Sequence, residues 1–382
     1  MKKKIIHIVD TLCVGGREKI IIDICNNLDQ KKYDVYIITL TNDINVIDNL
    51  INKDSVKYIE LPVKHKEIIG LNTVLSFFKV VSLLKKHLNN IKPDIIHSHS
   101  YLHRLLIVYS AIKTLKYNVK VFHTVHTSGL YYNPKGVLDK IKLFIEKSII
   151  GMIKPSLVSI SEVIHENNER LLIDVAKQIK YIPNGIDLEF YNRDNFNVAP
   201  EVFGVNKADI VLTYVARLCV GKNHLTLLKA IKLIVKTHPD IKLLLAGDGE
   251  TRNEIEQFIR IHSLEKNVIL LGSISNIGDL LSITNIALFP SEFEGFTLTL
   301  IEKMAMGLPV VAANNDIFSR LIKHRENGLL FAMFDEHELA KCVIELIENN
   351  ELYLLLSKNG MIFSEQFSIK RMVNEHELYY ES

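Results

Sequence analysis

Short runs of apolar residues alternate along the chain with longer segments whose apolar residues recur at helical spacing. The short runs have the length and continuous apolar character of strands buried on both faces of a parallel sheet. In the first half they predict strands at 4–9, 34–40, 94–97, 120–125 and 156–160. In the second half they predict strands at 209–216, 241–247, 267–272, 285–290 and 309–313. The longer segments predict helices at 17–28, 72–89, 137–152, 223–236, 251–262 and 337–350, and a terminal helix within 367–382.

Strands that alternate with helices in this way are typical of α/β folds with parallel sheets. The chain has 382 residues, and single cores usually stop growing at about 250–300 residues. Two domains are therefore expected, with the seam in a segment rich in turn-forming residues at 181–200. We predict two Rossmann-like, doubly wound domains, at 1–184 and 185–365. A C-terminal helix at 366–382 is expected to pack back on the N-terminal domain.

Composition and cysteine usage narrow the class of protein. Hydrophobic residues make up 48% of the chain and charged residues 24%, as in soluble globular proteins. The first apolar run is interrupted by His7 and Asp10, which favours a strand over a signal peptide. No stretch approaches the ~18 apolar residues of a membrane span. The cysteines lack disulfide or metal-binding spacing and predict reduced thiols in a cytoplasmic protein: Cys13, Cys25, Cys219 and Cys342.

Charge is divided unevenly between the two halves of the chain. Residues 1–182 hold 27 Lys and Arg against 17 Asp and Glu, whereas residues 183–382 hold 19 against 27. Two basic helical stretches, 64–88 and 137–154, carry lysines among apolar residues, and an anionic membrane surface attracts such segments by ~1 kcal/mol per lysine. A peripheral position on the inner face of the cell membrane is one interpretation. Ordinary variation in surface charge is the other.

Candidate binding residues follow several of the predicted strands, and open parallel sheets bind ligands beyond the carboxyl ends of their strands. Gly15 and Gly16 follow the first strand and would allow a ligand to approach the backbone where a helix begins. Arg217 and Lys222 follow the strand at 209–216 and suit a diphosphate, although a solvated pair of cations would have the same spacing. A turn of small residues follows the next strand: Gly247, Asp248 and Gly249.

The segment 291–315 carries two glutamates, Glu294 and Glu302, eight residues apart. A helix that begins between them would leave its first N–H groups free to face a ligand. The two carboxylates could then accept hydrogen bonds from the hydroxyls of one polyhydroxy ligand. A helix cap with one surface glutamate would give the same spacing, as would the acid/base pair of a glycosidase.

Several motifs, taken in order, resemble the family 4 retaining glycosyltransferases of GT-B fold over nearly the whole chain. They are "GGRE", "TVHT", "IPNGID", "ARLCVGKN", "LLLAGDGE" and "FPSEFEGFTLTLIEKMAMGLPVVA". The last contains the family's Glu-x7-Glu pattern. The resemblance implies two domains that face each other across a cleft. It also implies metal-independent transfer of a sugar from a nucleotide diphosphate donor, for example a UDP-sugar, to a glycan or lipid-linked acceptor in cell-surface polysaccharide synthesis.

The resemblance also implies roles for individual residues. Glu302 would bind the ribose hydroxyls, and Glu294 would contact the transferred sugar, helped by Gly295, Phe296, Thr297 and Leu298. Arg217 and Lys222 would hold the diphosphate. The remaining donor contacts would come from the glycine turns: Gly15, Gly16, Gly247, Asp248 and Gly249. His126, in "TVHT", would lie beside the donor sugar near the acceptor, and His99 would lie on the acceptor side.

This chain departs from many relatives after "PVVA", where it has "ANNDIFSRLI" in place of a Gly-Gly and a further glutamate. Other activities remain open: a GT-B sugar-nucleotide epimerase, a phosphorylase, or a non-catalytic nucleotide-sugar-binding module. A metal cluster of His97, His99, His123 and His126 is a further alternative, although His97 and His123 also fit satisfied core histidines. We expect no metal or other cofactor and no nucleic-acid partner.

Overall fold

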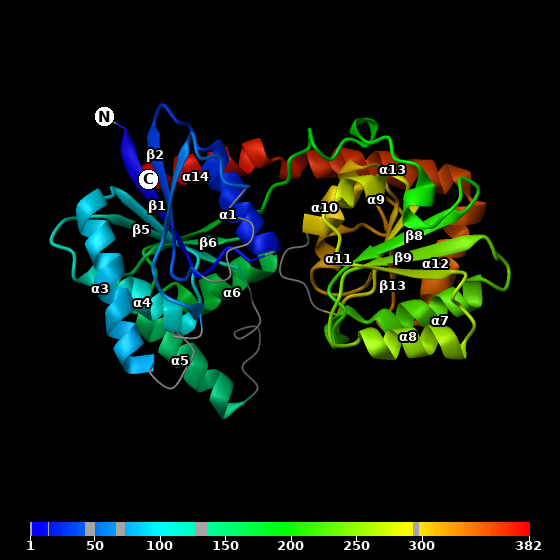
Figure 1. The fold of residues 1–382 in the computed structure, drawn as a ribbon, viewed down its shortest axis with the longest axis horizontal. Coiled ribbons are helices and arrows are strands. Elements are labelled where there is room, and N and C mark those ends of the chain that lie inside the picture. Colours follow the sequence, from blue (N-terminus) through cyan, green and yellow to red (C-terminus); the bar gives the residue numbers. More distant parts are fainter. Residues whose placement is uncertain (1, 14, 43–49, 66–72, 127–135, 293–297) are drawn as a thin grey trace. The chain divides into compact units, whose positions relative to one another are not determined.

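The computed structural model describes residues 2–13, 15–42, 50–65, 73–126, 136–292 and 298–382. Its internal contacts divide the chain into two units (Figure 1). Met1–Gly185 together with Ile369–Ser382 form the N-terminal domain, and Ile186–Ser368 form the C-terminal domain. The predicted seam after residue 184 lies one residue before this division. The predicted terminal segment starts at 366, and the chain rejoins the N-terminal domain at Ile369.

The N-terminal domain contains a sheet of seven strands, all paired in parallel, in the order β3-β2-β1-β4-β5-β6-β7. Ile5, Ile6 and Ile8 of the central strand β1 are fully buried, because helices cover both faces of the sheet. The strands are β1 (Lys3–Val9), β2 (Tyr33–Thr39), β3 (Val56–Glu60), β4 (Ile95–Ser98), β5 (Lys120–Val125), β6 (Ser156–Ser159) and β7 (Gln178–Tyr181).

Helices on one face of this sheet share a core with every second strand residue, such as Ile6 and Ile96. They are α3 (Thr73–Ile91), α4 (Leu102–Lys113) and α5 (Val137–Gly151). The neighbouring strand residues His7 and His97 face the other way, toward α14 (Ile369–Glu381), which lies beside α1 (Gly16–Asn27). α6 (Glu162–Leu172) packs against β6 and β7. The fully buried Tyr380 fixes α14 to this domain.

The C-terminal domain repeats the design with six parallel strands in the order β10-β9-β8-β11-β12-β13. The strands are β8 (Ile210–Val215), β9 (Ile241–Ala246), β10 (Val268–Gly272), β11 (Ile286–Phe289), β12 (Val310–Ala313) and β13 (Leu329–Phe331). One core contains residues of α7 (His224–Ile234), α8 (Arg252–Ile261) and α12 (Glu336–Glu348). A second core contains residues of α10 (Leu298–Ala305) and α11 (Phe318–Leu321). The remaining helices are α9 (Ile277–Ser282) and α13 (Asn350–Ser364).

The predicted α/β class with two Rossmann-like domains is confirmed. Each predicted strand agrees with an observed strand to within one residue at either end. The three strands that the pattern missed, β3, β7 and β13, all lie at the edges of sheets. Edge strands need no continuous apolar run, since one side of the strand and part of its faces stay exposed. Among the described residues, no helix combines the length and apolar character that a membrane crossing requires.

Candidate functional site

In the C-terminal domain, the turn after β9 is pressed against the turn after β8. The N–H of Leu218 donates to the carbonyl oxygen of Asp248 at 3.0 Å. A Cβ atom on Gly247 would lie 1.9 Å from the carbonyl oxygen of Ala216, and one on Gly249 would lie 2.2 Å from that of Leu218. Both glycines also have positive φ, 144° and 159°. Close packing of the two turns therefore requires these glycines, and the donor contact expected from them stays a prediction.

The turn after β8 is also joined to the segment after β11, which carries the glutamate motif. The N–H of Glu292 donates to the carbonyl oxygen of Gly221 at 3.0 Å. The hydroxyl of Tyr214 donates to the carbonyl oxygen of Lys222 at 3.0 Å and lies 2.7 Å from the Ser291 hydroxyl. These contacts bring the predicted phosphate-binding turn to the start of the predicted sugar-binding segment. Arg217 lies at the beginning of the same turn and is exposed.

Glu302 lies on α10 and is 8% exposed, between fully buried Ile301 and Lys303. A buried carboxylate is costly unless polar groups contact it, so this position favours a binding role over a surface glutamate. Leu298 is the first residue of α10 and is half-buried. Residues 293–297 lie outside the described residues, and they include four of the predicted site residues: Glu294, Gly295, Phe296 and Thr297.

The segment "ANNDIFSRLI", where this chain differs from the motif of many relatives, lies at the same edge of the sheet. The side-chain amide of Asn315 donates to the carbonyl oxygen of Ser291 at 2.9 Å. Its oxygen accepts from the N–H groups of Ile317 and Phe318 at 3.0 and 2.9 Å. The side chain of Asn315 therefore bonds two N–H groups at the start of α11 and joins this helix to the segment that precedes the glutamate motif.

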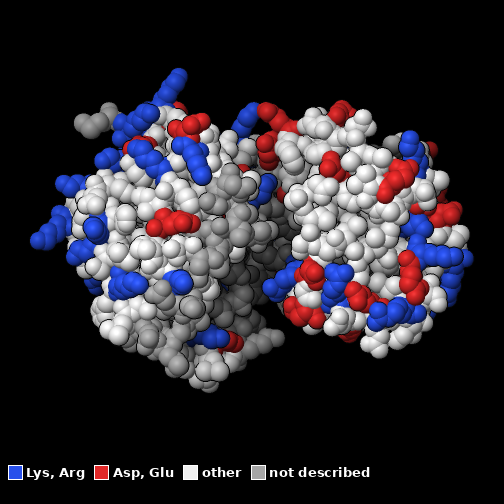
Figure 2. Space-filling model, in the orientation of Figure 1, with Lys and Arg blue, Asp and Glu red and all other residues white. Residues whose placement is uncertain are grey.

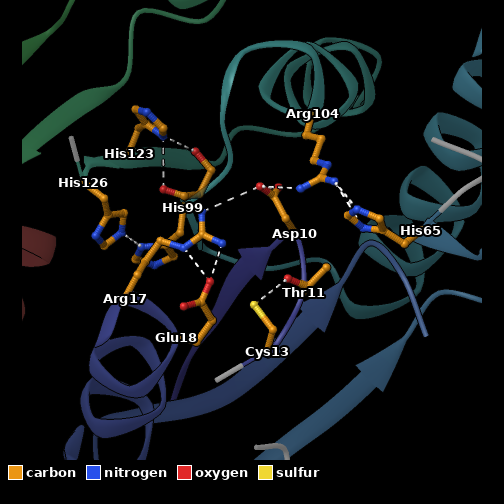
Figure 3. A network of polar contacts seen from close by, with 11 residues as sticks. Asp10, Thr11, Cys13, Arg17, Glu18, His65, His99, Arg104, His123 and His126 are labelled. Atoms are coloured by element: carbon orange, nitrogen blue, oxygen red, sulfur yellow. Dashed lines mark hydrogen bonds and ion pairs between the residues drawn. The ribbon is translucent and has the colours of Figure 1, made fainter. Parts of the chain in front are cut away.

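In the N-terminal domain, a fully buried carboxylate follows β1 (Figure 3). Oδ2 of Asp10 lies 3.2 Å from Nη1 of Arg104 and 3.8 Å from Nη1 of Arg17. Nε of Arg17 also donates to Oε1 of Glu18 at 2.7 Å, and its guanidinium lies 4.8 Å from the centre of the Tyr101 ring. Two guanidinium groups and two carboxylates thus form one balanced cluster at the carboxyl end of β1.

The glycine pair expected to approach a ligand lies at the start of α1. Gly16 is the first residue of the helix, and Gly15 precedes it in an extended conformation. A Cβ atom on Gly15 would lie 2.5 Å from Oε2 of Glu18, so the glycine makes room for that carboxylate. An anion that approaches this helix end therefore meets Glu18 and the Arg17 guanidinium beside it. Closure of the loop over phosphates stays a prediction.

A row of three buried imidazoles crosses the same domain. Nε2 of His126 lies 3.1 Å from Nδ1 of His99, and Nε2 of His99 lies 3.1 Å from Nδ1 of His7. His126 is 9% exposed, His99 1% and His7 0%. The sequence placed His99 on the acceptor side of the site. His99 is buried and both of its ring nitrogens face other histidines, and its place on the acceptor side stays a prediction.

Burial keeps these imidazoles neutral. It lowers the pKa of His7 to about 3 and the pKa values of His99 and His126 well below the ordinary range. The positive charge of Arg17 lowers the pKa of His126 further. At neutral pH each of the three rings therefore carries one N–H donor and one acceptor nitrogen.

The other two histidines of the proposed metal cluster have hydrogen-bond partners. His97 lies 2.6 Å from the Tyr380 hydroxyl and 2.7 Å from that of Thr124. Nδ1 of His123 lies 2.9 Å from the Ser98 hydroxyl. The expectation that His97 and His123 are satisfied core histidines is confirmed. The nitrogens that do approach one another within 4.8 Å belong to a different set, His7, His97 and His99. Both nitrogens of His97 and both of His99 already face partners, which favours a hydrogen-bonded network over metal ligation.

Comparison with known proteins assigns the family. Residues 14–190 match the model described as "Glycosyltransferase Family 4", and residues 195–362 match "Glycosyl transferases group 1". Together the two matches cover both domains. The protein belongs to the family 4 glycosyltransferases.

Curated relatives of this glycosyltransferase share about a quarter of its residues. It is 26% identical over 375 residues to UDP-Gal:alpha-D-GlcNAc-diphosphoundecaprenol alpha-1,3-galactosyltransferase of Escherichia coli, covering 94% of this chain and 91% of the relative. It is 27% identical over 291 residues to N-acetyl-alpha-D-glucosaminyl L-malate synthase of Bacillus anthracis, covering 75% and 74%. Among solved structures, Anabaena Alr3699/HepE in complex with UDP and glucose has a TM-score of 0.78 at 19% identity, with 100% of both chains covered. That structure supports the GT-B fold of the glycosyltransferase.

Sequence reasoning missed several residues of the N-terminal cluster. Arg17 and Glu18 stand inside the quoted "GGRE" motif, but only its glycines were considered. Asp10 follows the first predicted strand directly, which is the signal that could have identified it. Arg104 lies on α4, a helix that the pattern did not predict, so the sequence offered no comparable signal. His7 lies inside a predicted strand, and its alignment with His99 depends on the pairing of β1 with β4.

Proposed function

We propose that this glycosyltransferase transfers a sugar from a UDP-sugar, with retention of anomeric configuration and without a metal ion. The acceptor is a glycan or lipid-linked saccharide of cell-surface polysaccharide synthesis. The names of the relatives support the substrates, because the Escherichia coli enzyme uses UDP-Gal and a diphosphoundecaprenol-linked acceptor, and the Anabaena structure holds UDP and glucose. A cytoplasmic location at the inner face of the membrane would give access to both substrates.

One observation carries the proposal: hydrogen bonds join the two donor motifs, the Lys222 turn and the glutamate segment, at the carboxyl edge of the C-terminal sheet. The two motifs lie about 70 residues apart in sequence. The Glu292–Gly221 hydrogen bond and the hydroxyl of Tyr214 hold the Lys222 turn beside the glutamate segment. In this proposal a nucleotide diphosphate binds along this edge, with its phosphates at Arg217 and Lys222 and its ribose at the buried Glu302. In this proposal Glu294 and the residues after it contact the sugar, and His126 lies near the reacting sugar carbon.

The proposed chemistry breaks the bond between the anomeric carbon and the diphosphate oxygen, and UDP leaves with the electron pair. An acceptor oxygen bonds to the anomeric carbon on the face that UDP leaves, and its proton passes to the departing diphosphate. Arg217 and Lys222 stabilise the negative charge that develops on the diphosphate. In many transferases a divalent cation stabilises this charge. Because Arg217 and Lys222 would do so here, we propose that transfer needs no metal ion.

We further propose that the N-terminal domain docks on an anionic membrane. On the face shown in Figure 2, Lys and Arg side chains lie over this domain with few acidic ones. α5 adds apolar side chains that are largely exposed, Val137 (76%), Leu138 (71%) and Phe144 (71%), next to the exposed Lys140 and Lys142. Apolar groups beside lysines are typical of a helix that lies in a membrane interface.

Vesicle co-sedimentation tests the membrane proposal. Binding should require anionic lipid and fade at high salt. Binding should drop when Phe144 becomes serine. It should also drop when four lysines become glutamate: Lys85, Lys86, Lys140 and Lys142. The control is Lys232→Glu with Lys236→Glu, which changes exposed lysines of the C-terminal domain. Equal binding to neutral vesicles, or no loss in the lysine variant, would contradict this docking surface.

A panel of nucleotide sugars, scored by thermal shift and by nucleotide release, tests the function. UDP-sugars should stabilise the protein and release UDP slowly without acceptor and faster with one. A sugar nucleotide that is converted without release would indicate an epimerase instead. Release of a sugar phosphate from a glycan and phosphate would indicate a phosphorylase. Stabilisation without any turnover, across a broad acceptor panel, would indicate a binding module.

A further inference from the structure

The imidazole row has a direction, because a neutral imidazole can donate through only one nitrogen. His99 must donate to one neighbour and accept from the other. Either all three rings carry their proton on Nδ1, or all three carry it on Nε2. The N···N distances of 3.1 Å on both sides of His99 fit either arrangement, so the choice depends on the two ends of the row.

The buried end decides the direction. Nε2 of His7 has no hydrogen-bond partner among the described residues, and His7 is fully buried. Buried N–H groups without an acceptor are rarer in proteins than buried acceptors without a donor. His7 should therefore leave Nε2 unprotonated and place its proton on Nδ1. It then donates to His99, and His99 donates through Nδ1 to Nε2 of His126.

We propose that His7 and His99 are positioning residues that lock His126 in the Nδ1–H tautomer. Nδ1 of His126 then offers a hydrogen-bond donor, while Nε2 is held by His99. Free histidine prefers the opposite tautomer, with the proton on Nε2, so the row imposes the less common form. This inference rests on the proposed function, in which His126 lies at the reacting sugar.

The lock gives His126 a defined chemical role. A neutral N–H can stabilise negative charge on an oxygen of the donor without releasing its own proton. The Asp10–Arg17–Glu18–Arg104 cluster beside the row (Figure 3) is balanced in charge, so it adds no net charge. His126 is then a donor of fixed direction and not a general base, since its acceptor nitrogen is occupied by His99.

Long-range ¹⁵N–¹H correlation spectra of the full-length protein, labelled at histidine ring nitrogens, test the lock directly. The chain has 15 histidines, and signals are assigned from the spectra of single substitutions. At pH 7.5 the wild type should show Nδ1 protonated and Nε2 unprotonated in His7, His99 and His126. Nε2 protonated in His126 would overturn the proposal.

Two substitutions test the coupling. In His7→Met a thioether that can accept but cannot donate a hydrogen bond replaces the donor, so His99 and His126 should move toward the Nε2–H tautomer. The matched control is His376→Met, because His376 is also buried, at 3% exposed, and its ring centre lies 5.5 Å from that of His97. Among the hydrogen bonds of the described residues, none joins His376 to the row. Unchanged tautomers of His126 in His7→Met, or equal changes in the His376→Met control, would refute the coupling.

Rates of UDP release in single and double variants distinguish the tautomer lock from the proposed role of His126 in transfer. Loss of the donor at His126 should lower UDP release about tenfold, as expected for one hydrogen bond. His7→Met should show this loss in the wild-type background and no further loss in the background of His126→Ala. An additive loss would mean that His7 acts elsewhere, against the proposal. Nδ1–H tautomers together with a fully active His126→Ala would uphold the lock and refute the role of His126 in transfer.

Discussion

Replacing Gly249 by alanine tests whether the two turns of the donor site must pack without side chains. The new Cβ atom would lie 2.2 Å from the carbonyl oxygen of Leu218. Real Cβ atoms essentially never come within 3.0 Å of another heavy atom, so the turns must separate by about 0.8 Å. The three nearest atoms all belong to the backbone of Leu218, so no flexible side chain can move instead.

The expected cost combines two effects. A non-glycine residue at φ 159° stores ~1–3 kcal/mol of backbone strain. Overpacking of a tight contact adds ~1–3 kcal/mol. For a domain of this size each kcal/mol lowers Tm by about 2–4 °C, so we expect the C-terminal domain to melt on the order of 10 °C lower. The displaced Leu218–Asp248 contact should also shift Arg217 and weaken UDP binding about tenfold.

Differential scanning calorimetry and titration calorimetry with UDP measure the two effects. Gly221→Ala is the matched control for stability, because a Cβ atom there would meet nothing within 4 Å. It should melt within about 1 °C of the wild type, or slightly higher, since alanine reduces the entropy of the unfolded chain. Gly249→Ala that melted and bound UDP like the wild type would show that the turns can separate freely, and our packing argument would fail.

Three further outcomes are expected. Glu302→Gln should weaken UDP binding by about 1.5–3 kcal/mol in titration calorimetry, as expected for a charged hydrogen bond. Glu294→Gln should mainly slow turnover. Wild-type kinetics in both variants would contradict the two assignments. Arg217→Ala should lower UDP release more than Arg217→Lys does, because lysine keeps the charge and loses only the planar fork. UDP release should also survive EDTA. Activity restored only by added magnesium would contradict metal-independent transfer. Stability should fall as pH decreases from about 6.5 toward 3, because burial lowers the pKa of His376 to about 3 and the unfolded chain then binds more protons than the folded one. Above pH 6.5 this contribution is constant. Between pH 3 and 6.5, His376→Phe should reduce the slope of the unfolding free energy against pH by about 1.4 kcal/mol per pH unit. Urea titrations at several pH values measure this slope, and an unchanged slope would refute the contribution of His376.

The parts of the fold that could be predicted from sequence are those fixed by local pattern. Continuous apolar runs identified the central strands of both sheets, since these are buried on both faces. The exposed strand β3, "VKYIE", gave no such run. The glutamate motif and the Arg217 turn were identified because each follows a strand that the pattern placed correctly.

The parts that could not be predicted depend on pairing between distant residues. Asp10 and Arg104 are 94 residues apart and meet only because β1 pairs with β4 and α4 follows. The imidazole row depends on the same register, in which His7 lies opposite His97. Gly247 and Gly249 were identified as site residues, but their contact with the β8 turn follows from the pairing of β8 with β9. Spacing along the sequence contains none of these distances.

The most direct test of the central claim is the configuration of the sugar that the enzyme releases. ¹H NMR can follow hydrolysis of an α-linked UDP-sugar from the accepted donors, with no acceptor required and with enough enzyme that hydrolysis outpaces mutarotation. A retaining transferase should form the α-anomer of the free sugar first, together with one equivalent of UDP, in the presence of EDTA. Glu302→Gln should suppress both products at subsaturating donor. Initial formation of the β-anomer would contradict retention, and the absence of UDP release with every donor and acceptor would contradict glycosyl transfer itself.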